Sequence, residues 1–102
     1  MSSRFVLSTP ASDDLDEILT YVLEQSGPQR AQHVANRLQK DFCKLADSPG
    51  LGHKREDLTS APVLFWTVWS YLVIYTPDTS PLQIVRVLHG ARDVQAILEE
   101  VG

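Results

Sequence analysis

The chain has 102 residues, of which 43% are hydrophobic and 22% are charged, a balance that excludes a disordered protein and is typical of one small globular domain. A transmembrane helix is not expected because no run of about 18 apolar residues occurs, and the single cysteine excludes an internal disulfide framework. Thirteen acidic and nine basic residues give a formal net charge of −4. This charge argues against direct nucleic-acid binding, because nucleic-acid-binding proteins concentrate Lys and Arg. A basic patch can still assemble in space.

The first half of the chain is predicted to hold a short strand and two helices. Residues 4–8 carry strand-type apolar side chains, and Thr9 then resembles an N-cap, with Pro10 at the first helical position. An apolar stripe of helical period follows, and a second stripe begins after the break at Gly27 and Pro28. The stripes comprise Ala11, Leu15, Ile18 and Val22 in the first helix, and Ala31, Val34, Ala35, Leu38, Phe42, Leu45 and Ala46 in the second. So short a joint predicts an antiparallel helical hairpin.

Acidic residues crowd the start of the first predicted helix, at Asp13, Asp14, Asp16 and Glu17. The positive end of a helix dipole favours negative charge, and we interpret the cluster in that way. A pair of carboxylates for acid–base chemistry is the weaker alternative.

The second half of the chain changes to strand-type patterning. β-branched and aromatic residues fill positions 63–69, 71–76 and 82–89, and Ser70 alone separates the first two runs, so a tight turn should join them. Residues 94–101 return to helical spacing and predict a short C-terminal helix. The order is therefore β-α-α-β-β-β-α in a single domain over residues 1–102. This is an α+β fold with the helical hairpin packed on one face of a mainly antiparallel sheet.

No catalytic residue, metal site or cofactor is predicted. His33, His53 and His89 lie far apart in the sequence and share no metal-ligand spacing with Cys43. The five glycines are scattered through turns and form no phosphate-binding loop. Cys43 is expected to be a small buried or half-buried thiol.

Two tryptophans are candidates for a binding surface. Side chains alternate along a strand, so Trp66 and Trp69 are predicted to point to opposite faces, one into the core and one partly exposed. Core packing is the leading explanation. An exposed tryptophan is typical of protein interfaces, and stacking on a nucleobase is a further alternative that normally accompanies a basic groove.

The arginines of the second half are further candidates. Arg86 lies inside an apolar strand, so it faces solvent, pairs with a carboxylate or presents its guanidinium to a partner. Arg92 lies at the start of the last predicted helix, where the dipole disfavours a cation, and either Asp93 compensates or a partner does. The candidate partner-binding residues are Arg55, Trp66, Trp69, Arg86, His89 and Arg92.

The order and spacing of these segments resemble the RelE/ParE superfamily of toxin–antitoxin toxins over residues 4–100. The resemblance is strongest in FVLSTPASDDLDEILTYV, LADSPGLGHKREDL, YLVIYTP and IVRVLHGARDVQAIL, and the ending RVLHGARD is most similar to the ParE branch. It implies a hetero-oligomer with a cognate ParD-like antitoxin, whose extended segment wraps the toxin. ParE members are associated with inhibition of DNA gyrase, whereas RelE members cleave mRNA on the ribosome.

The residues favour the ParE branch. RelE-type ribonucleases are typically basic and place an arginine soon after a strand tyrosine, but here Leu72 follows Tyr71. Leu98 stands where such enzymes commonly have a tyrosine, although His89 and Arg92 keep that alternative open. We therefore predict a cytoplasmic, non-enzymatic toxin without a secretory signal, which inhibits gyrase and replication. The alternatives are a RelE-like ribosome-dependent mRNA endoribonuclease and a non-toxic relic that still binds antitoxin.

Overall fold

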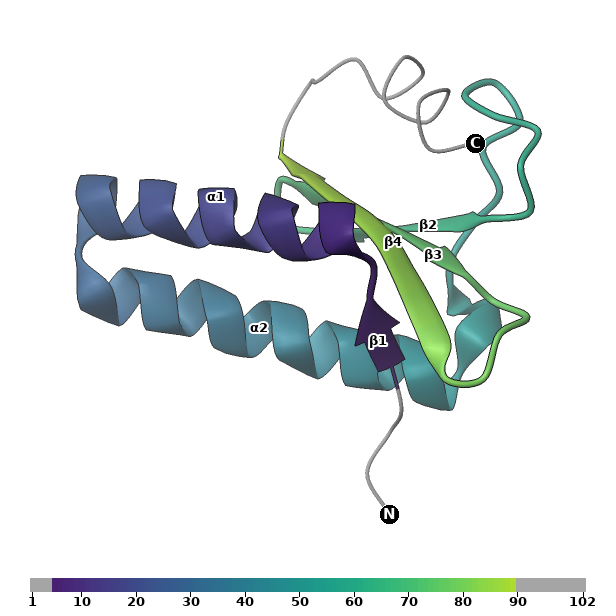
Figure 1. Ribbon diagram of the computed structural model, residues 1–102, viewed down its shortest axis with the longest axis horizontal. Helices are drawn as coiled ribbons and strands as arrows, with labels where there is room; N and C mark the ends of the chain where they lie inside the picture. The colour runs from purple at the N-terminus through teal and green to yellow at the C-terminus, as the bar shows by residue number, and fades with distance from the viewer. Residues whose placement is uncertain (1–4, 90–102) are drawn as a thin grey trace.

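The computed structural model describes residues 5–89, and they adopt the predicted α+β arrangement (Figure 1). The elements in chain order are β1 (Phe5–Leu7), α1 (Thr9–Ser26), α2 (Pro28–Asp47), the 3-10 helix η1 (Pro49–Leu51), β2 (Leu64–Val68), β3 (Tyr71–Thr76) and β4 (Leu82–His89). The C-terminal helix expected over residues 94–101 lies outside the described residues. Within residues 5–89, no helix has the length and apolar character needed to cross a membrane.

The four strands form one sheet in the order β1-β4-β3-β2. β2, β3 and β4 are antiparallel neighbours, and β1 lies parallel to β4 at one edge, which confirms a mainly antiparallel sheet. The register between β3 and β4 shifts, because Ile74 lies opposite Arg86 while Tyr75 lies opposite Ile84. Val85 is therefore an extra residue in β4, and such a bulge bends the strand locally.

The first helix begins one residue earlier than the sequence predicted. Ser8, and not Thr9, is the N-cap: its hydroxyl accepts the Ala11 N–H at 3.1 Å. The same hydroxyl donates to the Val85 carbonyl at 2.7 Å, and the Ser8 N–H donates to the Ile84 carbonyl at 3.0 Å. Ser8 is the N-cap because its hydroxyl and N–H also bond to β4. This contact joins residues far apart in the chain, so the local sequence pattern does not predict it.

The two helices form the expected antiparallel hairpin on one face of the sheet (Figure 1). Gly27 ends α1, donating its N–H to the Leu23 carbonyl, and Pro28 begins α2 directly. The φ angle of Gly27 is 88°, which a residue with a side chain rarely adopts. A single glycine can therefore reverse the chain between two long helices.

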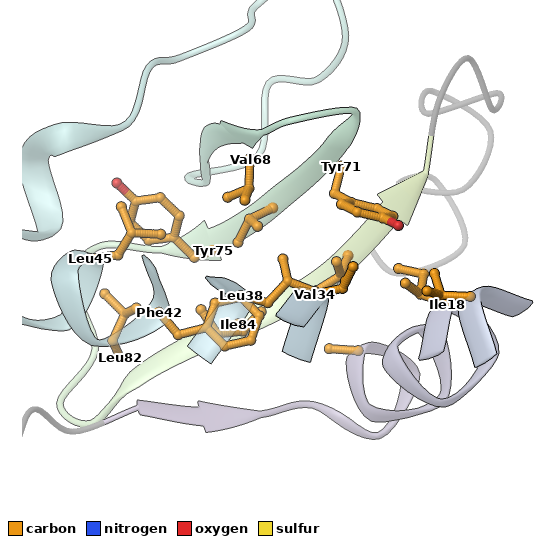
Figure 2. Close-up of a cluster of buried hydrophobic side chains, with 14 residues drawn as sticks. Ile18, Val34, Leu38, Phe42, Leu45, Val68, Tyr71, Tyr75, Leu82 and Ile84 are labelled. Carbon is orange, nitrogen blue, oxygen red and sulfur yellow. The ribbon is translucent and has the colours of Figure 1, made fainter. Parts of the chain in front are cut away.

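The main core lies between the hairpin and the sheet (Figure 2). Ile18, Leu38, Phe42 and Leu45 are buried there, as their spacing predicted. Leu15 is only partly buried, because the buried stripe of α1 passes through Asp14 and leaves Leu15 on its flank.

A second, smaller apolar cluster lies on the other face of the sheet. It comprises Val63, Phe65, Ile74, Val85 and Leu88, with Leu58 and Leu72 packed against it. The connection before β2 is attached to this region by two backbone hydrogen bonds between His53 and Phe65. The Tyr75 hydroxyl also accepts the Gly52 N–H at 2.8 Å and donates to the Pro49 carbonyl at 2.7 Å.

Candidate partner-binding site

Arg86 is held by a buried carboxylate of α1. Its Nε and Nη2 donate to the two oxygens of Asp14 at 2.7 and 2.9 Å, and the Val87 N–H donates to the same carboxylate at 3.0 Å. Only 4% of the Asp14 side chain and 15% of the Arg86 side chain are exposed. Of the three interpretations of Arg86, pairing with a carboxylate is the one observed. Its role toward a partner remains a prediction.

Asp14 was expected to serve helix-start electrostatics, and that interpretation needs correction. Asp14 lies beyond the first turn of α1, and its carboxylate is used across the interface with β4. The reason is geometric: β1 ends at Leu7, so the outer edge of β4 beyond Ile84 has no strand beside it. The start of α1 covers that edge, and Asp14 supplies an acceptor that a neighbouring strand would otherwise provide.

An apolar groove lies between α1, α2 and β1, with a volume of about 200 Å³. Its lining is almost entirely hydrophobic and comprises Phe5, Leu7, Leu15, Leu19, Ala35, Leu38, Gln39 and Phe42. Val6, in the edge strand β1, is 45% exposed. A groove of this kind suits the apolar face of an amphipathic segment.

Trp69 lies in a turn and not in a strand, which corrects the sequence prediction. β2 ends at Val68, and Trp69 and Ser70 form the two-residue turn to β3, where Val68 pairs with Tyr71. The turn presents the indole to solvent on the side of α2, with 42% of Trp69 exposed. The expected contrast between a sheltered and an exposed tryptophan holds, but it arises from the turn and not from strand alternation.

Three basic side chains of α2 surround the Trp69 ring. The guanidinium carbons of Arg37 and Arg30 lie 5.1 and 5.7 Å from the ring centroid, within range of cation–π attraction. The His33 ring stacks on the indole with centroids 5.5 Å apart and planes inclined by 27°. The exposed aromatic is therefore embedded in positive charge.

Trp66 is the sheltered tryptophan and is half-buried against the main core. Its Nε1–H donates to the buried Asp41 carboxylate at 3.0 Å, and Asp41 also accepts from Arg37 Nε at 3.2 Å. The Lys44 ammonium lies 5.6 Å from the centroid of the Trp66 ring. Trp66 thus combines a packing role with a position on the same side of α2 as Trp69.

His89 lies beside the turn that carries Trp69. Its ring lies 4.7 Å from that of Tyr71, and its Nε2 is 3.1 Å from the Ser70 hydroxyl.

A pocket of about 180 Å³ lies beside His89, lined by Glu17, Ile18, Tyr21, Tyr71 and His89. A neighbouring pocket of about 190 Å³ shares Tyr21 and Tyr71 and reaches Trp69 and Arg30. Burial raises the pKa of Tyr71, opposed by the positive charge of Arg30. Trp69 and His89 are therefore brought together around Tyr71.

The remaining candidates are not part of this grouping. Arg55 lies in the exposed connection before β2 and pairs with Asp57 at 2.9 Å. Arg92 lies outside the described residues. Among residues 5–89, no three His, Cys, Asp or Glu side chains gather closely enough to hold a metal ion.

The basic face of α2 was not predicted from the sequence. Arg30, His33, Arg37, Lys40 and Lys44 recur at steps of three and four, so they share one side of the helix. The same periodicity test that revealed the apolar stripes would have revealed this one, had it been applied to charge. We call these five residues the basic stripe.

Comparison with known proteins identifies the family of this fold. The family described as ParE toxin of type II toxin-antitoxin system, parDE, matches residues 5–94, which is most of the chain.

The chain belongs to the ParE toxin family.

Relatives and solved structures agree with the family assignment. Two proteins of Caulobacter vibrioides are similar along nearly their whole length: Toxin ParE3, 32% identical over 93% of this chain and 94% of that protein, and Toxin ParE1, 34% identical over 90% and 94%. A chain of the chromosomal ParDE system from P. aeruginosa superposes with a TM-score of 0.71 at 19% identity, covering 88% of this chain and 98% of that one. A chain of the RelBE2 toxin–antitoxin complex from Mycobacterium tuberculosis gives 0.52 at 21% identity, over 87% and 99%. At these identities the two structures establish only that the fold is shared. The same fold occurs in a ParDE system and in a RelBE system.

Proposed function

We propose that this ParE-family chain is a toxin that acts by binding proteins and not by catalysis, with DNA gyrase as its target in the cytoplasm. Membership of the ParE family supports the gyrase target. The observation that carries the binding mechanism is the Asp14–Arg86 pair: the guanidinium in β4 is held by a buried carboxylate. A ribonuclease needs its cations directed at the scissile phosphate to stabilise developing charge.

The partner that neutralises the toxin is proposed to be a ParD-like antitoxin, forming a hetero-oligomer. The solved structures with this fold come from toxin–antitoxin systems. The apolar groove between α1, α2 and β1 is a suitable binding site for an amphipathic antitoxin segment. Leu15, Leu19 and Phe42 would contact its apolar face.

The ribosome-dependent endoribonuclease is the alternative that must be tested, because the fold is shared with the chain from the RelBE2 complex and His89 is exposed. His89 is the only histidine near Arg92 in the sequence, and histidine is the most frequent general acid or base in enzymes. Catalysis would therefore depend on its imidazole, whereas binding would not.

The test is growth inhibition on induction without antitoxin, followed by a supercoiling assay with purified gyrase. We expect His89→Gln to remain toxic and folded. Arg92→Ala should be weakened in both assays, and Arg92→Lys should keep partial activity because it retains the charge but not the planar fork. An essential His89 together with unaffected supercoiling would contradict the gyrase proposal and favour RNA cleavage. A chain that neither inhibits growth nor affects supercoiling would be the antitoxin-binding relic.

A further inference from the structure

Charge is segregated between the two helices of the hairpin. α1 contains five acidic residues, Asp13, Asp14, Asp16, Glu17 and Glu24, and no lysine or arginine. α2 contains four of the nine lysines and arginines of the chain, Arg30, Arg37, Lys40 and Lys44. A protein whose formal net charge is −4 therefore presents one concentrated basic face.

The basic stripe is exposed to solvent along its length. All five of its side chains are exposed. The acidic residues of α2 are Asp41 and Asp47, and Asp41 is 5% exposed and shared between Arg37 and Trp66. Asp47 lies at the C-terminal end of the helix, three residues after Lys44.

Trp69 is held against the N-terminal part of this stripe, at Arg30, His33 and Arg37, by a strained backbone. Its φ angle is 54°, and it is the one residue other than glycine in the described chain with a positive φ. It occupies the first central position of a two-residue hairpin turn, where glycine is preferred because a side chain is crowded at positive φ. Trp69 is a large aromatic residue at positive φ, and 42% of it stays exposed beside the basic side chains that it contacts; such outliers point to function.

We propose that Trp69 and the basic stripe form a binding surface for an acidic segment of a protein partner, separate from the apolar groove. This inference rests on the proposed function of the chain as a toxin that binds proteins. Arginine forks match carboxylates in pairs of hydrogen bonds, and a central tryptophan with charged neighbours is the usual composition of an interface anchor.

Two features favour an acidic protein segment over a nucleic acid. An extended phosphate backbone would continue beyond the stripe onto surface without such a concentration of cations, and the net charge of −4 would repel it at long range. A short acidic segment needs to contact the stripe alone.

The new surface and the apolar groove lie on different sides of α2. Ala35, Gln39 and Phe42 line the groove, whereas Arg30, Arg37 and Lys44 approach the tryptophans on the other flank of the buried face. The two surfaces can therefore be occupied at once by different segments.

The direct test measures fluorescence anisotropy of a short labelled peptide that alternates glutamate and leucine, titrated with the full chain. We expect it to bind, and its glutamine counterpart not to bind. Arg30→Glu should weaken binding about tenfold, because it reverses a charge within the surface. Lys54→Glu is the matched control: it changes the net charge equally but lies in the connection before β2, so binding should stay within about twofold of the wild type.

Trp69→Gly separates binding from folding. Glycine relieves the positive φ and offsets the lost contacts of the indole with His33, Arg30 and Arg37, so the melting temperature should change little, while binding should fall about tenfold for loss of the anchor. Should this variant fail to fold by circular dichroism, Trp69→Ala and Arg30→Glu decide the matter.

Three results would overturn the inference. The first is that the wild type does not bind the acidic peptide, and the second is that Arg30→Glu and Lys54→Glu lose equal affinity for it. The third is tighter binding of single-stranded DNA of equal charge, which would indicate a nucleic-acid surface. The gyrase assay remains independent. A wild-type chain that binds the peptide but spares supercoiling contradicts the gyrase target alone, and one that inhibits gyrase without binding the peptide contradicts this surface alone.

Discussion

Asp14 is a buried carboxylate whose position in the sequence gives no sign of its partner. It belongs to a run of acidic residues on α1, yet it accepts hydrogen bonds from Arg86 and from the Val87 N–H, 72 and 73 residues away. Its neighbour Asp13 is exposed. A buried ion pair contributes little net stability over an apolar replacement, but removal of one partner leaves an uncompensated charge.

We therefore expect Asp14→Ala to lower the free energy of unfolding by about 3–5 kcal/mol, because Arg86 and the Val87 N–H would both lose their acceptor. Thermal and urea denaturation measure this loss. Asp13→Ala serves as the control and should change stability by no more than about 0.5 kcal/mol. Equal effects of the two substitutions would show that the carboxylate of Asp14 is not needed in β4 pairing.

At the scale of elements, the hairpin is attached to the sheet by one apolar face of α2. Phe42 is 2% exposed and its ring meets that of Phe5 edge to face, with centroids 5.4 Å apart. Leu38 and Leu45 continue the same face toward β2, β3 and β4 (Figure 2). The junction after α2 is equally constrained, because Gly52 lies directly against the Tyr75 ring.

Phe42→Ala should destabilise the fold by about 3–5 kcal/mol, since it removes a buried ring and leaves a cavity between α2 and β1. For a domain of this size, such a loss corresponds to a fall in melting temperature of roughly 12 °C or more. Calorimetry of the purified variant provides the measurement. A loss below about 1 kcal/mol would mean that the hairpin is not attached through this face.

Gly52→Ala should cost about 2–4 kcal/mol, because a methyl group there would lie 2.6 Å from the Tyr75 hydroxyl oxygen and 2.8 Å from the Phe65 carbonyl oxygen. Tyr75 would have to move and lose its hydrogen bonds to Gly52 and Pro49. Gly50→Ala is the matched control, because a methyl group at that position meets no atom within 4 Å. Urea denaturation of both variants tests the difference, and similar midpoints would refute the close approach.

At the scale of the whole molecule, two surfaces of different chemistry lie on the two flanks of α2. The apolar groove suits a hydrophobic segment, and the basic stripe with Trp69 suits an acidic one. A chain with an open apolar groove is prone to self-association, because exposed apolar area is covered by any available partner.

We expect light scattering to show self-association of the isolated toxin and a monodisperse complex after antitoxin is added. Leu19→Glu, which places a charge in the groove, should weaken antitoxin binding about tenfold or more. Leu23→Glu is the control, because Leu23 is 48% exposed on the same helix and does not line the groove. A monodisperse toxin that Leu19→Glu leaves fully able to bind antitoxin would exclude the groove as the antitoxin seat.

The sequence by itself determined the α-helices and strands of residues 5–89, their order and most of the core, because apolar periodicity and turn residues act over short stretches of chain, but it did not predict η1. Ile18, Leu38, Phe42 and Leu45 were placed correctly for that reason. The tertiary structure alone decided which side chains meet across the fold. It paired Arg86 with Asp14, and it chose Ser8 as the N-cap through its bond to β4. In the folded chain β2 also ends at Val68, so Trp69 lies in the turn, where its indole contacts Arg30 and Arg37 of α2. These contacts join residues far apart in the chain, and their energies depend on distances that no local pattern encodes.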